Sequence, residues 1–510
     1  MPGDVVLRRR RGRVERLRRA LTVPALFSTG YGNVGSSIYY ALGVTALYAL
    51  GAAPLALVVA GAFFVFTVLT YAEATVAVPE AGGASSFARH GLGEFVSFFA
   101  GWATMLSYTV TISISAFAVS GYMSVFFPEL ASYPANVVFT LGVIGLLAAL
   151  NCVGVREATT VSVAFAVLDL TTQVLLVTVG VVTLLNVPLL ISQVHFGTVP
   201  TWSNFAYSIS IAMVAYTGIE TISNMVEEAR NPAQTVPRSY GLLVVAVLVL
   251  FMGISVVALS AMPVQCEHPE AMISADPIQC ADDAYTTDLG TKYVADPVAG
   301  IARALPEPLN RIFEPIVAVL ASTILLIAAN AGIMGVSRLT FSMGGYFQLP
   351  SFLSRIHRRF RTPYVSVLVF CLVAALIVLP GNLGDIADVY IFAAMLTFTL
   401  AHVSVIAMRI RVPDLDRPFR LGLGIMIRGS EIPVTAIIGG LGTFTVWLII
   451  VVTRPFGRWA GLAWMLLGIG SYLWYRRRSG LPINRTVRRG TRTASAAPST
   501  SAGGRSIRSR

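Results

Sequence analysis

Long apolar runs alternate with short polar loops along nearly all of this 510-residue chain. Each run is about 20 residues long, the length that an α-helix needs to cross the hydrocarbon core of a bilayer. The pattern therefore predicts an all-α polytopic membrane protein with twelve transmembrane helices. Their approximate bounds are 23–50, 54–79, 95–123, 134–153, 158–186, 203–226, 239–262, 313–342, 363–380, 385–408, 432–453 and 458–475.

Two of these spans contain sequences that are poorly suited to a continuous helix. The first includes STGYGNVGSSIYYALG (28–43), and its break is expected at about 30–37; the sixth has Thr217, Gly218 and Glu220 at its centre. A broken helix persists in a membrane only where protein or a cavity supplies partners for its backbone groups. Breaks at matching places in two five-span halves are typical of the midplane site of a secondary transporter. The alternative is close packing of small residues between helices.

Composition and charge agree with a membrane location. Hydrophobic residues make up 55% of the chain and charged residues 12%, which excludes an ordinary soluble protein of this length. With the N-terminus inside, 32 of the 37 basic residues fall on the cytoplasmic side, as the positive-inside rule requires. We therefore expect a multi-pass protein of the plasma (inner) membrane with both termini cytoplasmic. The net charge of +12 indicates contact with anionic lipid rather than with nucleic acid.

Two carboxylates inside spans are candidates for proton coupling, because ionisable groups in a bilayer are usually functional. Asp169 lies in the middle of the fifth span with no basic residue nearby in the sequence. It is either a proton carrier or a protonated side chain that is hydrogen-bonded within the bundle. Glu220 either handles substrate or protons, or fastens helices together. Thr111 and Ser115 belong to a polar stripe on the third span, and such hydroxyls line a site or join helices.

Other chemistry-bearing residues are few. Cys266 and Cys280 lie in the longest outer loop (263–311), where they form a disulfide or remain as two unpaired thiols. The sequence has no hydrolase, nucleotide-binding or metal-ligand motif. We therefore expect neither an enzyme nor a cofactor or metal site.

Four stretches resemble the amino acid–polyamine–organocation (APC) superfamily of transporters. They are TYAEATVAVPEAGGASSFARHGLGE (70–94), AYTGIETISNMVEEARNPAQTVPRS (215–239), SRLTFSMGGYFQLPSFLSRIHRRFRTPYVSV (337–367) and MRIRVPDLDRPFRLG (408–422). The resemblance covers nearly the whole chain and implies a LeuT-like fold, in which two five-helix repeats are inverted and helices 1 and 6 are discontinuous. The implied regions are a basic cytoplasmic N-tail (1–22), repeat 1 (23–190), repeat 2 (200–410), helices 11 and 12 (430–476) and a basic disordered cytoplasmic tail (477–510).

The same resemblance implies a substrate site between helices 1 and 6. Backbone N–H groups of the Gly35-Ser36-Ser37 turn would bind a substrate carboxylate, and carbonyl groups of 214–217 would bind the amino group. The expected substrate-binding residues are Gly32, Asn33, Gly35, Ser36, Ser37, Tyr40, Thr111, Ser115, Val214, Ala215, Tyr216 and Thr217. Tyr40 and Tyr216 would shape the side-chain pocket. Some proton-coupled members carry a Lys at the place of Asp169, so this chain has the opposite charge there.

A second resemblance leaves the substrate open. YGNVGSSIYY (31–40) is similar to the first helix of KUP-type potassium transporters, with Asn33 in place of an ion-binding Asp. The preferred hypothesis is a proton-coupled secondary transporter of an amino acid or related amine, whose partners are that small molecule, protons and the bilayer. The alternatives are a potassium/proton symporter and a membrane sensor that binds substrate without net flux.

Overall fold

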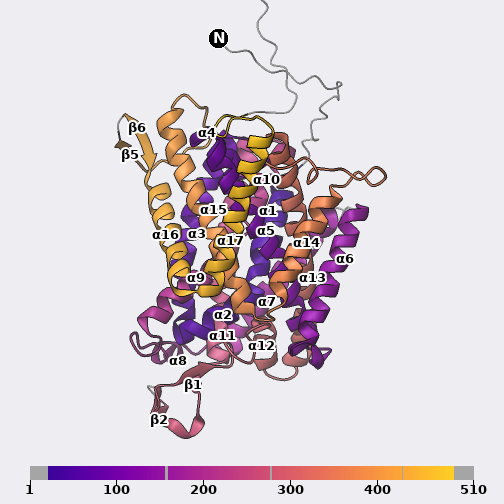
Figure 1. The fold of residues 1–510 in the computed structure, drawn as a ribbon. Helices are drawn as coiled ribbons and strands as arrows, with labels where there is room; N and C mark the ends of the chain where they lie inside the picture. Colours follow the sequence, from indigo (N-terminus) through magenta and orange to yellow (C-terminus); the bar gives the residue numbers. More distant parts are fainter. Residues whose placement is uncertain (1–20, 155–158, 276–277, 428, 487–510) are drawn as a thin grey trace, which may run out of the picture.

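A computed structural model of the protein describes residues 21–154, 159–275, 278–427 and 429–486. The predicted tails 1–22 and 477–510 lie for the most part outside these residues. The long helices form one bundle, and the short strands lie at its two ends (Figure 1). Within the described residues, nine helical stretches are long and apolar enough to cross a membrane. The prediction of a helical polytopic membrane protein is confirmed.

The helices of the first half come from the N-terminal part of the chain. They are α1 (Val23–Val34), the 3₁₀ turn η1 (Gly35–Ser37), α2 (Ile38–Ala49), α3 (Ala53–Ala77), α4 (Ala84–Gly91), α5 (Glu94–Met123), α6 (Ala135–Val153), α7 (Thr159–Thr183) and α8 (Val187–Ser192). The helices of the second half follow. They are α9 (Trp202–Ala215), α10 (Glu220–Asn224), α11 (Pro232–Ala261), α12 (Pro297–Ala304), α13 (Leu309–Gly345), α14 (Tyr364–Val378), α15 (Leu383–Arg411), α16 (Val434–Thr453) and α17 (Pro455–Arg478).

Three features explain why the described structure has nine such stretches and the sequence predicts twelve spans. The first two predicted spans form one helical run from Val23 to Ala77, because 3₁₀ turns join α1, α2 and α3. Helix α14 has only 15 residues. Helix α17 carries three arginines in its last turn, which lowers its hydropathy. The count of twelve spans and the inverted repeat stay predictions.

Helix α5 lies at the centre of the bundle. It packs against α13, α15, α4, α14 and α6, and nearly all of its residues are buried. Small and hydroxyl-bearing side chains along α5 let these helices approach closely, as is common where helices pack in membranes. The third predicted span is therefore the helix around which the others are arranged.

The two ends of the bundle differ. Helix α4 and the hairpin of β5 (Gly424–Ile427) with β6 (Ser430–Pro433) lie at one end, and α8, α12, β1 and β2 lie at the other (Figure 1). The loop expected outside the membrane contains two short antiparallel pairs, and a disulfide joins Cys266 to Cys280 within it. Its strands are β1 (Val264–Cys266), β2 (Met272–Ala275), β3 (Ile278–Cys280) and β4 (Tyr285–Thr287).

A buried ion pair holds α3 against α15 at the α4 end. Glu73 accepts two hydrogen bonds from the guanidinium of Arg409, at 2.7 and 2.9 Å, and a third from the N–H of Leu421 at 3.2 Å. Arg417 lies beside the pair and donates to carbonyl oxygens at the end of α15, including that of Met408. Glu73 therefore lies beside two arginines, and Arg417, 4.0 Å from it, also satisfies carbonyl groups that the helix end leaves unpaired.

Replacing Glu73 should destabilise the bundle. Glu73→Leu leaves the buried Arg409 with only the more exposed Glu431 carboxylate, 3.8 Å away, and loss of a buried charge partner typically costs about 3–5 kcal/mol. We expect a lower Tm for Glu73→Leu in detergent, partial recovery in Glu73→Leu/Arg409→Leu, and little change for the exposed control Glu267→Ala. A Tm for Glu73→Leu equal to that of the control would contradict the role assigned to this ion pair.

Candidate functional site

The first transmembrane segment is interrupted but not unwound. The α-helix of α1 gives way to the 3₁₀ turn at Gly35–Ser37 before α2 begins. The hydroxyl groups of Ser36 and Ser37 donate to the carbonyl oxygen of Asn33, at 2.9 and 3.4 Å. Serine hydroxyls compete for backbone carbonyls in this way and favour a local change of helix type. The interruption is therefore shorter than the break predicted at about 30–37.

The sixth segment is unwound over residues 216–219, between α9 and α10. Gly218 has a φ of +104°, a left-handed conformation that glycine adopts without strain. The carbonyl oxygen of Val214 accepts hydrogen bonds from the N–H and the hydroxyl of Thr217, at 3.2 and 2.8 Å. The carbonyl oxygens of residues 215–217 accept no hydrogen bond from the part of the chain that the structure describes. In the predicted 214–217 set, the Val214 carbonyl oxygen is therefore already paired, and those of the other three residues are unpaired acceptors among the described residues.

The side chain of Asn33 joins the two interruptions. Its Nδ2 donates to the hydroxyl oxygen of Thr221 at 2.7 Å and to the carbonyl oxygen of Gly218 at 3.4 Å. A Cβ atom placed on Gly218 would lie 2.8 Å from the Asn33 side chain, closer than real Cβ contacts allow. Glycine at this position therefore permits both the unwound backbone and the close approach of helix 1.

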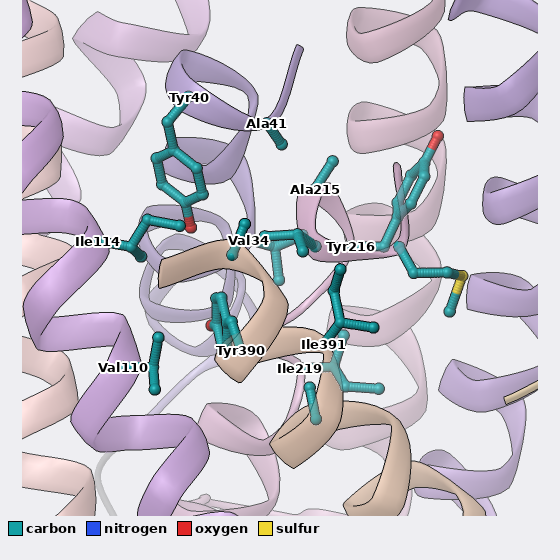
Figure 2. Packing of buried hydrophobic residues seen from close by; sticks show 14 of the residues in the cluster. Val34, Tyr40, Ala41, Val110, Ile114, Ala215, Tyr216, Ile219, Tyr390 and Ile391 are labelled. Atoms are coloured by element: carbon teal, nitrogen blue, oxygen red, sulfur yellow. The ribbon is translucent and has the colours of Figure 1, made fainter. Parts of the chain in front are cut away.

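Hydroxyl groups from three helices surround this junction. Ser37 Oγ and Tyr40 Oη lie 2.9 Å apart, and Thr111 Oγ1 lies 2.8 Å from Tyr390 Oη. The hydroxyl of Ser115 is buried and has no hydrogen-bond partner among the described residues. Among the apolar residues of the core, Val34, Val110, Ile114, Ala215 and Ile391 lie around Tyr40 and Tyr390 (Figure 2).

Tyr216 and Gly32 belong to the predicted substrate-binding residues, and the structure shows what surrounds each of them. The ring of Tyr216 is directed away from Tyr40 and Tyr390 (Figure 2); its hydroxyl donates to the Leu57 carbonyl oxygen on α3 at 2.9 Å. Tyr216 therefore fastens helix 6 to helix 2 instead of shaping a pocket beside Tyr40. Gly32 lies within α1 and would tolerate a Cβ, whose nearest neighbours would be more than 3.5 Å away.

Asp169 ties both halves of helix 1 to α7. Its carboxylate accepts hydrogen bonds from Tyr31 at 3.0 Å, from Tyr39 at 2.6 Å and from Gln173 at 2.9 Å. Tyr31 precedes the 3₁₀ turn and Tyr39 follows it, so a single carboxylate spans the interruption. Asp169 therefore contacts the helix on each side of the 3₁₀ turn.

Glu220 has a different environment. It begins α10 directly after the unwound segment, and its side chain is 2% exposed. Its Oε2 atom has no hydrogen-bond partner among residues that the structure describes. The phenol groups of Tyr71, Tyr108 and Tyr240 interact with it electrostatically. Of the two predicted carboxylates, Asp169 is therefore fully hydrogen-bonded and Glu220 keeps a free oxygen.

A small cavity of about 30 Å³ begins at Thr221, next to the Asn33 contact, and reaches Arg338. Its other walls include Thr29, Tyr108 and Asn224. This volume accommodates one or two water molecules and is too small for an amino acid. In this conformation the cavity beside the junction can hold water but not an amino acid.

Sequence reasoning missed Thr221, Tyr31 and Tyr39. Each is a hydroxyl residue within one helical turn or two of a predicted break, which is the only signal that the sequence carries for them. Their partners lie at least 130 residues away, so the pairing depends on how the helices pack.

Comparison with known proteins agrees with this architecture. The family model described as "Amino acid permease" matches residues 27–470. The chain is 25% identical to the branched-chain amino acid permease BcaP of Bacillus subtilis, over 91% of this chain and 94% of that protein. It is also 25% identical to the methylthioribose transporter of Bacillus subtilis, over 91% of this chain and 95% of that protein. Cationic amino acid transporter 3, mitochondrial, of Arabidopsis thaliana is 26% identical over 79% of this chain and 64% of its own length. A match over this much of the sequence, on a helical membrane fold, shows that the chain belongs to the amino acid permease family, which is part of the APC superfamily.

Proposed function

We propose that this protein is a secondary active transporter that carries an amino acid, or a related amine, through the plasma membrane by alternating access. The observation that carries the proposal is the Asn33 contact, which brings the interrupted helix 1 against the unwound segment of helix 6. Family membership supports amino acid transport. We further propose that the α4 end of the bundle faces the cytoplasm, since it holds the loops that are rich in arginine.

The two interruptions have complementary electrostatics for a zwitterion. At helix 1 the Gly35 N–H still donates to the Tyr31 carbonyl oxygen, so the Gly35–Ser37 turn has to open before the start of α2 offers free N–H groups, and their partial positive charge, to a carboxylate. The carbonyl groups of 215–217 have partial negative charge and suit an ammonium group. A bound amino acid would therefore lie between them, in contact with main-chain atoms at both ends.

The surrounding side chains favour an aliphatic substrate. Val110 and Ile114 on α5 and Ile391 on α15 lie across from the two interruptions (Figure 2). An apolar wall stabilises a bound aliphatic side chain by about 0.8 kcal/mol for each buried methylene group. It disfavours a charged side chain, which loses its hydration there. This preference agrees with the similarity to a branched-chain amino acid permease.

Asn33 argues against potassium as the substrate. Its amide presents an N–H donor toward the Gly218 carbonyl, whereas a cation site requires oxygen ligands and gains from negative charge. We therefore keep the potassium/proton symporter only as an outcome to be tested.

We propose that protons drive uptake through Asp169. Protonation removes the charge that Tyr31, Tyr39 and Gln173 stabilise, and so weakens the link between α7 and both halves of helix 1. Glu220, with its unpaired oxygen, is the second candidate for this role.

Uptake of leucine into proteoliposomes tests the function directly. We expect saturable uptake that isoleucine and valine inhibit more strongly than arginine or potassium, because the wall opposite the two interruptions is apolar. Saturable leucine binding without flux would indicate a sensor, and stabilisation by potassium alone would overturn the proposal.

Gly218→Ala tests the location of the site. The added methyl group would collide with Asn33, so leucine uptake should fall by about tenfold or more, equivalent to at least ~1.4 kcal/mol. Gly241→Ala on α11 is the matched control, since its Cβ would meet no atom within 4 Å. Equal uptake by the two variants, at equal Tm, would place the site elsewhere.

Asp169→Asn tests proton coupling. The wild type should take up leucine faster when the outside is made more acidic than the inside, because protons then enter down their gradient. The amide cannot gain or lose a proton, so Asp169→Asn should retain leucine binding and lose this response. Full pH dependence in Asp169→Asn would assign coupling to another group, and Glu220→Gln is the variant to measure next.

A further inference from the structure

A second pocket lies at the α4 end of the bundle, between the C-terminal turn of α17 and the loop that follows α13. Its volume is about 360 Å³, within the range of small-molecule sites in proteins. Ser351 and Phe352 form one wall, and Trp474, Tyr475, Arg478 and Ser479 form the other. None of these residues belongs to the candidate substrate site.

The two walls are held at a fixed separation by a buried polar cluster. Gln348 lies just before the first wall and donates to Glu94 Oε1 at 2.9 Å. Arg476 lies in the helical turn that forms the second wall, and it donates to the same oxygen at 2.8 Å. Both Gln348 and Arg476 are completely buried. The pocket is therefore a built feature of the bundle rather than a gap between mobile loops.

The chemistry of the pocket combines a cation, aromatic rings and hydroxyl groups. The guanidinium of Arg478 lies 5.3 Å from the ring centroid of Trp474 and is exposed to solvent. Ser351 and Ser479 add hydroxyl donors, and Tyr475 adds a phenol. Arginine and hydroxyl groups together bind phosphate oxygens. The charge of Arg476 is compensated by its ion pair with Glu94, so Arg478 is the cation that the pocket offers to a ligand.

Two exposed apolar side chains border the same pocket. Phe352 is 47% exposed and Trp474 is 57% exposed. Tryptophan with neighbouring arginine is typical of the boundary between hydrocarbon and headgroups. A ligand in this pocket would therefore have an anionic phosphate at Arg478 and an apolar part along Phe352 and Trp474.

We propose that this pocket binds the headgroup of an anionic phospholipid of the membrane leaflet at the α4 end. Phosphatidylglycerol has the required chemistry, with one phosphodiester, hydroxyl groups and two acyl chains. A free phosphate would meet the same arginine but would leave Phe352 and Trp474 uncovered, so the exposed rings favour lipid over a soluble anion. The bound lipid would link the end of α17 to the loop after α13 and so stabilise this end of the bundle.

Lipid titration of the purified full-length protein in detergent tests the proposal. Dioleoyl phosphatidylglycerol should raise the Tm saturably and remain bound in native mass spectrometry, whereas dioleoyl phosphatidylcholine should do neither. Arg478→Gln should weaken the apparent affinity about fivefold, because one arginine near a phosphate contributes about 1 kcal/mol. Arg477→Gln is the matched control: it removes the same charge from the same exposed turn but from a residue outside the pocket.

Each outcome decides the proposal. Selective loss of phosphatidylglycerol binding in Arg478→Gln and in Trp474→Ala supports a headgroup site. Equal losses in Arg478→Gln and Arg477→Gln would show that the lipid responds only to net charge, and would overturn it. Equal stabilisation by inorganic phosphate would show that a soluble anion is the ligand, and would also overturn it. The measurement needs no transport, so it stands or fails independently of the function proposed above.

Discussion

The hydrogen bonds of Asn33 are the interaction on which the candidate site depends. A membrane interior offers no water to backbone groups, so an interrupted helix must find partners within the protein. In this chain helix 1 supplies a partner for the unwound segment of helix 6. The amide of Asn33, on helix 1, donates to the Gly218 carbonyl and the Thr221 hydroxyl on helix 6. Gly218 makes this contact sterically feasible. In the part of helix 6 that the structure describes, the carbonyl groups of residues 215–217 remain unpaired, and the proposed function assigns them to a substrate ammonium group.

The charged groups of the bundle are arranged in layers around this junction. Asp169 binds to tyrosines on both sides of the helix 1 turn, and Glu220 lies just beyond the helix 6 break. At the α4 end, Glu73 pairs with Arg409 and Glu94 pairs with Arg476. At this end each carboxylate pairs with an arginine from another helix and so fastens helices together, whereas the two carboxylates near the centre lack a cation within the described structure. The carboxylates paired with arginine hold the fold, and the two without a cation are the candidates for the proton coupling proposed above.

Much of the architecture follows from the sequence. The alternation of apolar runs and polar loops predicts a helical membrane protein, because a helix satisfies its own backbone groups wherever it lies in the bilayer. The four stretches that resemble APC transporters predict the family, and the comparison over residues 27–470 confirms it. The Gly and Ser residues at 35–37 and the pair Thr217-Gly218 also mark where helices 1 and 6 are interrupted, since these residue types weaken a helix in any context.

Only the tertiary structure decides what each interruption contacts. From the sequence, Tyr216 is expected to shape the substrate pocket, yet packing turns its ring toward α3. Asp169 has no basic residue nearby in the sequence and only Gln173 as a local partner, yet two tyrosines more than 100 residues away also bind it. The sequence by itself determined the helices and the places where they weaken, because those depend on neighbouring residues and on hydrophobic length. The partners of Asn33, Asp169 and Arg476 depend on distances between helices that are far apart along the chain, and these distances exist only once the bundle has packed.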